Sequence, residues 1–229
     1  MTYVDKLGGS GRADTIVASL PTGKFGGSQV YPRAVKPSVE FLIIVATAPI
    51  TLALVFILAL LIATDGSNPF YTQVRVGRNG KLFRIWKLRT MVPNADRMLA
   101  AYLASDDTAR EEWEKTQKLK KDPRVTRLGR FLRKSSLDEL PQLFNVLNGT
   151  MSLVGPRPML VNQQESYPGS SYYKMKPGIT GVWQVYARNE SGFSQRAKYD
   201  DLYHRVMSWR TDATLLFKTV GVVFRSTGH

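Results

Sequence analysis

One uncharged hydrophobic segment constrains the fold of this chain more than any other feature. From Phe41 to Ala63 the sequence reads FLIIVATAPITLALVFILALLIA, which is 23 residues without a charged side chain. At about 1.5 Å per helical residue it extends roughly 35 Å, enough to cross the hydrocarbon core of a bilayer. A cleavable signal peptide would lie nearer the N-terminus, so we interpret the segment as a retained membrane anchor. We expect a disordered Gly- and Pro-containing tail at 1–36, a membrane helix at 37–65 and a cytoplasmic domain at 66–225.

The charges that flank this segment do not select its orientation. Six basic residues lie within 20 residues of it, three on each side: Lys24, Arg33, Lys36, Arg75, Arg78 and Lys81. The positive-inside rule therefore favours neither direction. A balanced count also fits a helix that enters and leaves on the same face, and Pro49 would kink such a helix by removing a backbone hydrogen bond. We expect the hydroxyls of Thr47 and Thr51 to satisfy the freed carbonyls. A re-entrant helix and a spanning helix both remain open on this reasoning.

The rest of the chain predicts a mixed α and β domain that is mostly helical. Residues 70–76 and 81–86 alternate in polarity around Gly77-Arg78-Asn79-Gly80, which predicts a β-hairpin closed by an Asn-Gly turn. Residues 96–121 contain no Gly or Pro and predict one solvent-facing helix. A further helix is expected at about 141–148, and two amphipathic helices at about 194–225.

The net charge indicates an anionic partner. The 32 Lys and Arg exceed the 18 Asp and Glu by 14, which favours nucleic acid, anionic lipid or a phosphorylated substrate. The basic residues are concentrated at 120–134, where Val125, Leu128 and Leu132 recur at helical spacing. This pattern predicts a basic amphipathic helix on an anionic membrane surface, with a solvated charged face over a small core as the alternative. The basic run has little aromatic interleaving, which argues against nucleic acid.

Two adjacent carboxylates, Asp138 and Glu139, are the strongest candidates for a reactive centre. Ser136 and Glu139 also fit the capping box of a helix start. In that case, however, Pro141 would be the fifth helical residue, where its missing N–H breaks a hydrogen bond. If Pro141 is instead the first helical residue, both carboxylates lie just before the helix, where the helix dipole stabilises their anionic form.

Such carboxylates among cations are suited to attack on a phosphate. An aspartate is already ionised at neutral pH, so it needs no separate base. Because a diphosphate is also an anion, the site needs basic side chains and a hard divalent ion such as Mg²⁺, held by carboxylate and phosphate oxygens. Arg157 is the best placed of the cations, since prolines on both sides restrict the backbone that presents it. The candidates for phosphate binding are Lys87, Arg89, Arg133, Arg157 and Arg188.

These motifs resemble those of the bacterial sugar transferases that prime polysaccharide assembly on a polyprenyl phosphate carrier. The matching segments are 84–91 (RIWKLRTM), 122–129 (DPRVTRLG), 137–142 (LDELPQ), 151–158 (MSLVGPRP) and 176–181 (KPGITG). The resemblance implies a re-entrant membrane helix and a catalytic domain that lies on the cytoplasmic face of the bacterial inner membrane.

The resemblance also implies a reaction and assigns roles to residues. Asp138 would attack the β-phosphorus of a UDP-sugar, UMP would leave, and undecaprenyl phosphate would take the sugar phosphate, as the first step of exopolysaccharide synthesis. Glu139 would assist with metal or proton handling, and the two carboxylates would share Mg²⁺. The residues that would hold phosphates are Lys87, Arg133, Arg157 and Arg188. Weaker similarity at 112–120, 188–189 and 217–219 suggests galactose or glucose as the sugar.

Two positions depart from the family pattern, and one rival interpretation remains. Ala48 stands before Pro49 where the family usually has serine, and Ala187 replaces a glycine, although alanine accepts positive φ less readily. The rival is a non-enzymatic basic scaffold on the membrane surface, which fits the anchor and the charge but does not explain Asp138 and Glu139. No Gly-x-Gly-x-x-Gly or Gly-Lys-Ser/Thr loop supports a Rossmann or P-loop nucleotide site.

Overall fold

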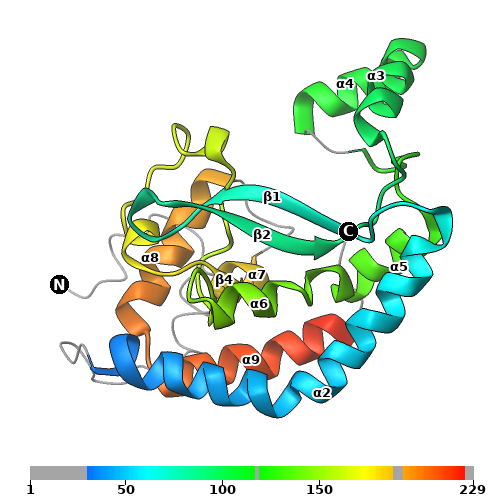
Figure 1. Ribbon diagram of the computed structural model, residues 1–229. Coiled ribbons are helices and arrows are strands. Elements are labelled where there is room, and N and C mark those ends of the chain that lie inside the picture. The colour runs from blue at the N-terminus through cyan, green and yellow to red at the C-terminus, as the bar shows by residue number, and fades with distance from the viewer. Residues whose placement is uncertain (1–29, 117–118, 188–192, 225–229) are drawn as a thin grey trace.

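A long N-terminal helix borders the fold in the computed structural model, which describes residues 30–116, 119–187 and 193–224 (Figure 1). A π-helical turn, Tyr31–Val35, leads directly into α2, Lys36–Ile62. Helical structure thus begins several residues before the boundary expected at 37, and the proline at the start of the turn suits a helix start because no N–H is needed there. By length and composition this is the one helix among the described residues able to cross a membrane, and only 11% of its most apolar stretch is buried in the protein.

The helix α2 continues through Pro49, and Figure 1 shows it changing direction along its length. The hydroxyls of Thr47 and Thr51 do accompany this proline, but they donate to the carbonyls of residues 43, 44, 47 and 48. The carbonyl that Pro49 deprives of its partner belongs to Val45. Our expectation about the two threonines was therefore wrong, because a helical threonine reaches only the carbonyls three or four residues before it. A hydroxyl at position 48, where this chain has alanine, would be three residues from Val45.

The β-hairpin lies across the opposite side of the molecule from the first half of α2 (Figure 1). It consists of β1 (Phe70–Val76) and β2 (Leu82–Leu88), which pair antiparallel as predicted, with Val76 opposite Leu82. Asn79 and Gly80 have φ of 58° and 74°, so the turn uses the left-handed conformations that these two residues tolerate best. A second sheet was not predicted. It pairs β3 (Ser152–Val154) with β4 (Gly178–Thr180) in parallel, and both strands are too short to show an alternation in sequence.

Two helices, α3 (Ala95–Ser105) and α4 (Asp107–Thr116), replace the single helix expected over 96–121. Asp106 separates them with an extended backbone. Its carboxylate accepts hydrogen bonds from the N–H groups of Thr108 and Ala109, so it begins a second helix. The single-helix prediction was wrong because aspartate caps a helix as readily as it continues one. Figure 1 shows the pair projecting from the rest of the domain.

The remaining helices, except α7, agree with the sequence patterns. The basic amphipathic segment forms α5 (Arg127–Ser135), with Leu132 buried and Arg127 and Arg130 exposed. After it come α6 (Gln142–Leu147), as expected, and α7 (Val182–Tyr186), a five-residue helix that was not predicted. The two C-terminal helices are α8 (Arg196–Val206) and α9 (Trp209–Phe224).

Both halves of α2 pack on the domain. Ile44, in the first half, belongs to the largest hydrophobic cluster, together with residues of β2, α6, β3, α8 and α9. Leu58, Ala59 and Ile62, in the second half, form a separate cluster with Leu88 of β2 and Leu132 of α5. The intervening turns expose large apolar side chains, Ile50 and Leu52 among them, at 75% and 67%. The helix α2 is therefore part of the core at its two ends and exposed between them.

Candidate active site

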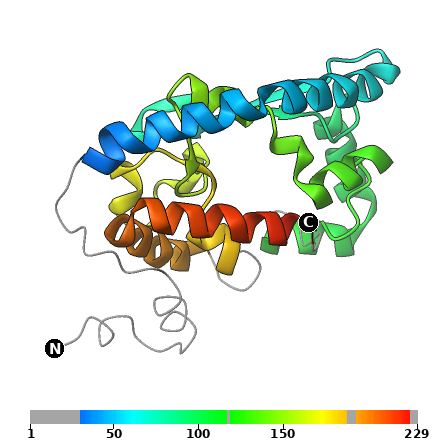
Figure 2. The same cartoon turned by 90° about the horizontal axis from the view of Figure 1, so that it is seen from below.

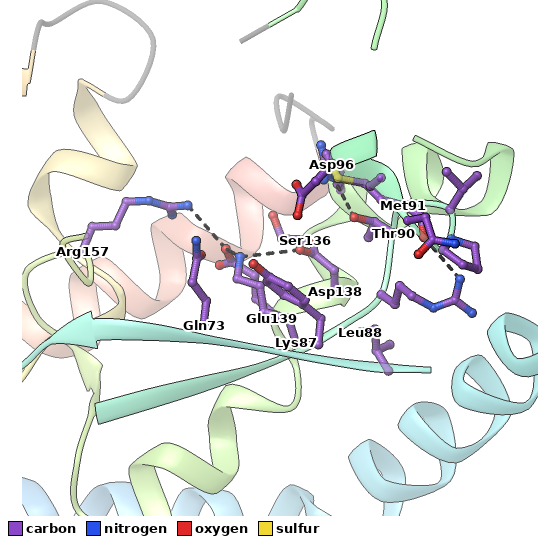
Figure 3. A pocket seen from close by; sticks show the side chains of 17 residues that line it. Gln73, Lys87, Leu88, Thr90, Met91, Asp96, Ser136, Asp138, Glu139 and Arg157 are labelled. Atoms are coloured by element: carbon purple, nitrogen blue, oxygen red, sulfur yellow. Dashed lines mark hydrogen bonds and ion pairs between the residues drawn. The ribbon is translucent and has the colours of Figure 1, made fainter. Parts of the chain in front are cut away.

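A cavity of about 680 Å³ collects nearly all the residues predicted to carry chemistry (Figure 3). It lies between the hairpin, the start of α3 and the segment that joins α5 to α6. The predicted residues that line it are Lys87, Arg89, Arg133, Asp138, Glu139 and Arg157. Arg188, the remaining candidate, lies outside the described residues.

The two carboxylates sit on a single 3₁₀ turn, Leu137–Glu139, between α5 and α6. Ser136 precedes the turn in a left-handed conformation with φ of 56°, and its side chain makes no capping hydrogen bond. The capping-box alternative is thus not realised. Pro141 adopts helical dihedrals one position before α6 begins at Gln142, so the carboxylates lie outside the α-helix, as the second alternative required.

A buried asparagine fixes this turn beside strand β2. Asn145 in α6 is 1% exposed, and its side chain accepts from the N–H of Trp86 and donates to the carbonyl of Arg84. The asparagine therefore occupies both backbone groups that flank Ile85 on that edge of the strand. Lys87 lies two residues after Ile85 on the same strand. The hydrogen bonds of Asn145 therefore place Lys87 next to the carboxylates.

Lys87 contacts both carboxylates, but unequally. Its Nζ lies 2.7 Å from Oε1 of Glu139 and 3.7 Å from Oδ2 of Asp138. Arg157 adds a second cation on the same side, with Nη2 3.5 Å from Oε1 of Glu139 (Figure 3). Glu139 consequently carries the tighter ion pairs, and Asp138 is the less firmly held of the two anions.

Burial sets the protonation behaviour of Asp138. The residue is 8% exposed, and loss of solvation raises the pKa of its carboxyl. Lys87 opposes this shift, the nearby Glu139 reinforces it, and Arg133 again lowers the pKa. An ionised Asp138 is thus a poorly solvated anion held by cations, a state in which a carboxylate oxygen is available as a nucleophile.

Arg133 and Arg89 differ in how many of their N–H donors are used within the protein. Arg133 donates from Nε to Thr90 Oγ1 at 2.9 Å, and burial lowers the pKa of its guanidinium. Arg89 instead uses all five of its N–H donors within the protein, on Asp65 and on the carbonyls of Ile62, Asn68 and Met91. These contacts argue against the prediction that Arg89 binds a phosphate. They make it a link between the end of β2 and the end of the membrane helix.

Two further arginines, which the sequence did not single out, surround the backbone that presents Arg157. Arg196 is 3% exposed, donates from Nη2 to the carbonyl of Arg157 and pairs with Asp200. Four aromatic rings enclose its guanidinium: Tyr167, Tyr172, Trp183 and Phe193. Arg75 lies near Arg157, and burial together with that neighbouring charge lowers its pKa to about 10. The only sequence signal for Arg196 was the four-residue spacing to Asp200 on a helix.

The carboxylates suit a divalent cation that arrives with a phosphorylated ligand. Within the described residues no three acidic, histidine or cysteine side chains converge on one point. Asp138 and Glu139 supply two carboxylates, and Mg²⁺ is often held by one or two carboxylates together with substrate phosphate oxygens. Asp138 and Glu139 are thus suited to hold the expected Mg²⁺ together with the phosphate oxygens of a diphosphate.

Residues 31–226, which include the cavity and every motif named above, match the family described as bacterial sugar transferase. The chain belongs to this family. The resemblance inferred from the motifs is thereby confirmed.

Individual relatives of this bacterial sugar transferase carry more specific names. An "Undecaprenyl-phosphate galactose phosphotransferase" of Salmonella typhimurium is 51% identical over 169 residues, which are 73% of this chain and 36% of that protein. A "UDP-glucose:undecaprenyl-phosphate glucose-1-phosphate transferase" of Klebsiella pneumoniae is 38% identical over 206 residues, covering 85% and 40%. The "Exopolysaccharide production protein ExoY" of Sinorhizobium fredii is 41% identical over 192 residues, covering 83% and 84%. The chain thus spans about four-tenths of the first two relatives and most of the third.

Proposed function

We propose that this bacterial sugar transferase moves a hexose 1-phosphate, galactose or glucose, from a UDP-sugar to undecaprenyl phosphate, as the first step of exopolysaccharide synthesis. The observation that carries the proposal is the buried Asp138 beside Lys87, in a cavity that Arg133 and Arg157 also line. The names of the Salmonella and Klebsiella relatives support the substrate class, and that of the Sinorhizobium relative supports the pathway.

The proposed reaction has two displacements at phosphorus. A carboxylate oxygen of Asp138 forms a bond to the β-phosphorus of the UDP-sugar, and the bond from that phosphorus to the bridging oxygen breaks, which releases UMP. A phosphate oxygen of the polyprenyl phosphate then attacks the same phosphorus. The bond from Asp138 breaks, the carboxylate is regenerated, and the product is a polyprenyl diphosphate sugar.

The surrounding side chains have complementary roles in this proposal. Lys87, Arg133 and Arg157 bind phosphate oxygens and offset the repulsion between two anions. Arg188 joins them by its motif position. Glu139, which pairs with Lys87 and Arg157, orients both cations and helps to hold Mg²⁺ or a proton. A Mg²⁺ bound with the diphosphate supplies further neutralisation of charge.

The proposed setting is the cytoplasmic face of the bacterial inner membrane, with α2 re-entrant and anionic lipids beneath the domain. The change of direction in α2 supports this topology (Figure 1). Large apolar side chains on α9 support the contact with lipid, since Trp209, Phe217 and Val220 are 58%, 79% and 54% exposed. Helices α2 and α9 both lie along the lower edge of Figure 1 and are seen together from below in Figure 2.

Release of UMP tests the proposal. Detergent-purified protein with Mg²⁺, UDP-galactose or UDP-glucose and undecaprenyl phosphate should release UMP, and Asp138→Asn should abolish it because an amide is not a nucleophile. The acceptor-independent first step should leave labelled sugar phosphate on the wild type and none on the variant. Full activity in Asp138→Asn would refute the nucleophile. Absence of UMP release with any UDP-sugar would favour the non-enzymatic scaffold.

A further inference from the structure

Two charged side chains are buried at the very start of the membrane helix. Lys36 and Glu40 lie one turn apart on α2, and they are 7% and 8% exposed, whereas Phe41 and Leu42 beside them are 54% and 65% exposed. Burying a charge is unfavourable unless the protein supplies partners for it. The partners of these two residues therefore indicate what the first turns of α2 are built to contact.

Lys36 is bound by three acceptors from distant parts of the chain. Its Nζ donates to the carbonyl of Val154 at 2.7 Å, to the hydroxyl of Tyr203 at 2.6 Å and to Oδ2 of Asp212 at 2.7 Å. The hydroxyl of Tyr31 also donates to Asp212, at 2.7 Å. All three protons of the ammonium group are thus engaged, and the start of the membrane helix is attached to both β3 and α9.

Glu40 holds the other end of the same strand. Its Oε1 accepts from Ser152 Oγ at 2.5 Å and from the N–H of Leu153 at 3.0 Å. Because Lys36 also donates to the carbonyl of Val154, each of the three residues of β3 is hydrogen-bonded to a side chain in the first two turns of α2. The helix side chains therefore fix the whole length of this three-residue strand.

The strand β3 leads straight into the segment that presents Arg157. Gly155 follows it and has no room for a side chain, because a Cβ there would overlap the carbonyl of Lys176. Prolines 156 and 158 restrict the next residues. Arg157 then lies 3.5 Å from Glu139. Only two residues, Gly155 and Pro156, therefore separate the bond to Lys36 from a cation of the active site.

The second half of α2 reaches the other wall of the same cavity. Ile62 and its neighbours pack on Leu88 and Leu132, each of which is adjacent in sequence to a cation of the site, Lys87 and Arg133. The carbonyl of Ile62 accepts from Arg89. One helix thus contacts the wall that carries Arg157 through polar bonds and the wall that carries Lys87 and Arg133 through apolar packing, with Pro49 between the two contacts.

We propose that α2 sets the spacing of the active-site walls, and that Lys36 and Glu40 are positioning residues that place Arg157 against Glu139, beside Lys87, through strand β3. The proposal rests on the proposed function, in which these cations bind the diphosphate. In this arrangement the anchor is a structural part of the phosphate-binding site as well as its attachment to the membrane.

The test removes Lys36 together with Asp212, the carboxylate closest to its ammonium group, so that Asp212 is not left as a buried anion without its cation. Glu40, which lies 3.7 Å from Lys36, keeps its hydrogen bonds from Ser152 and Leu153. In Lys36→Met/Asp212→Asn, kcat/KM for UMP release should fall about 10- to 100-fold, the scale of a small misplacement of a catalytic group. When Lys36→Met/Asp212→Asn is combined with Arg157→Ala, kcat/KM should fall little further than in Arg157→Ala alone, because the effect of the buried pair passes through Arg157. Added to Arg133→Ala, which removes a cation whose side chain is bonded to Thr90, the two losses should multiply. Lys198→Met, which removes an exposed lysine of α8, is the matched control and should retain wild-type kcat/KM.

Hydrogen exchange gives a readout that does not depend on the reaction. The amides of Leu153, Val154, Gly155 and Arg157 should exchange faster in the Lys36→Met/Asp212→Asn variant, while those of the β1–β2 hairpin should not change. Ser152→Ala, which removes one bond to Glu40 and little volume, should show a smaller change of the same kind if the double variant does not fold. Unchanged exchange at 153–157, or losses that multiply with Arg157→Ala, would overturn the proposal. A wild type without UMP release would instead refute the proposed function, and the exchange result would still decide the positioning role.

Discussion

The residues of the site differ in how far a sequence can reveal them. Asp138, Glu139 and Arg157 were found from local patterns, because adjacent carboxylates and an arginine between prolines are visible without any fold. Asn145 and Arg196 were missed, since their partners lie 61 and 39 residues away and become neighbours only on folding. Arg89 was a candidate for phosphate binding because of its charge, and its contacts with Asp65 show why charge alone does not distinguish a ligand-binding arginine from a structural one.

Replacing Asp138 by asparagine should stabilise the folded protein at neutral pH. Burial raises the pKa of this carboxyl in the folded state above its ordinary value in the unfolded state. Between these two pKa values the folded state binds a proton that the unfolded state does not, so the carboxyl favours folding as the pH falls and opposes it once ionised. Asparagine removes that unfavourable ionisation.

Thermal unfolding across pH checks this expectation. The Tm of Asp138→Asn should exceed that of the wild type at pH 7, and the difference should disappear at a pH below the ordinary carboxyl pKa, where Asp138 is neutral in both states. Glu139→Gln is the matched comparison and should lower the Tm at pH 7, because it removes the partner of Lys87 and Arg157. A variant of Asp138 that is less stable than the wild type at pH 7 would contradict the argument.

At the scale of elements, periodic segments were predictable and short or capped ones were not. The hairpin, α5 and the two C-terminal helices follow patterns of polarity that extend over many residues. The break between α3 and α4 was missed because it depends on which of two backbone conformations Asp106 adopts. The strands β3 and β4 were missed because each has only three residues, too few to show a pattern of polarity. The small parallel sheet forms because α2 and β4 hold β3 in place, and neither partner is close to it in sequence.

The contact of α5 with the end of β2 requires a glycine at 129. A Cβ at this position would overlap the backbone carbonyl of Thr90, which also accepts from the N–H of Thr126. Gly129→Ala should therefore push α5 away, weaken the bond between Thr90 and Arg133, and lower stability by about 1–3 kcal/mol.

Gly221→Ala is the control for this substitution. Gly221 lies in α9, where an added Cβ would meet no atom within 4 Å, and the replacement should stabilise the helix by about 1 kcal/mol. Denaturant unfolding of the two variants measures both effects. Equal stability of Gly129→Ala and the wild type would show that α5 is not held as closely as the packing indicates.

At the scale of the whole molecule, the topology of α2 can be tested with single cysteines, because the chain has none of its own. Arg33 precedes α2 and Lys81 lies on the hairpin of the catalytic domain, and both are exposed. If the helix is re-entrant, Arg33→Cys and Lys81→Cys should react with an impermeant maleimide from the same side of the membrane. Labelling from opposite sides would establish a spanning helix.

The orientation of the domain on the membrane makes a separate prediction. Phe217 on α9 and Leu82 on the hairpin are both exposed apolar residues, at 79% and 58%, but they lie on different sides of the fold. With the protein in nanodiscs, a polarity-sensitive dye on Phe217→Cys should emit at the shorter wavelengths typical of lipid, and the same dye on Leu82→Cys should emit as in water. Similar emission from both sites would contradict a lipid-facing α9.

The burial of Lys36 and Glu40 also has a consequence for biosynthesis. A ribosome produces α2 long before Ser152 and Asp212, which are 112 residues beyond Glu40 and 176 residues beyond Lys36. When the helix first meets the bilayer, these two side chains have only each other, at 3.7 Å in the folded protein, so both must stay hydrated among the lipid headgroups. Only when α9 has been made can Lys36 leave the headgroups for the interior. We therefore expect α2 to reach its final position after the rest of the domain has folded, with Asp212 of α9 completing the contacts that hold the start of the helix.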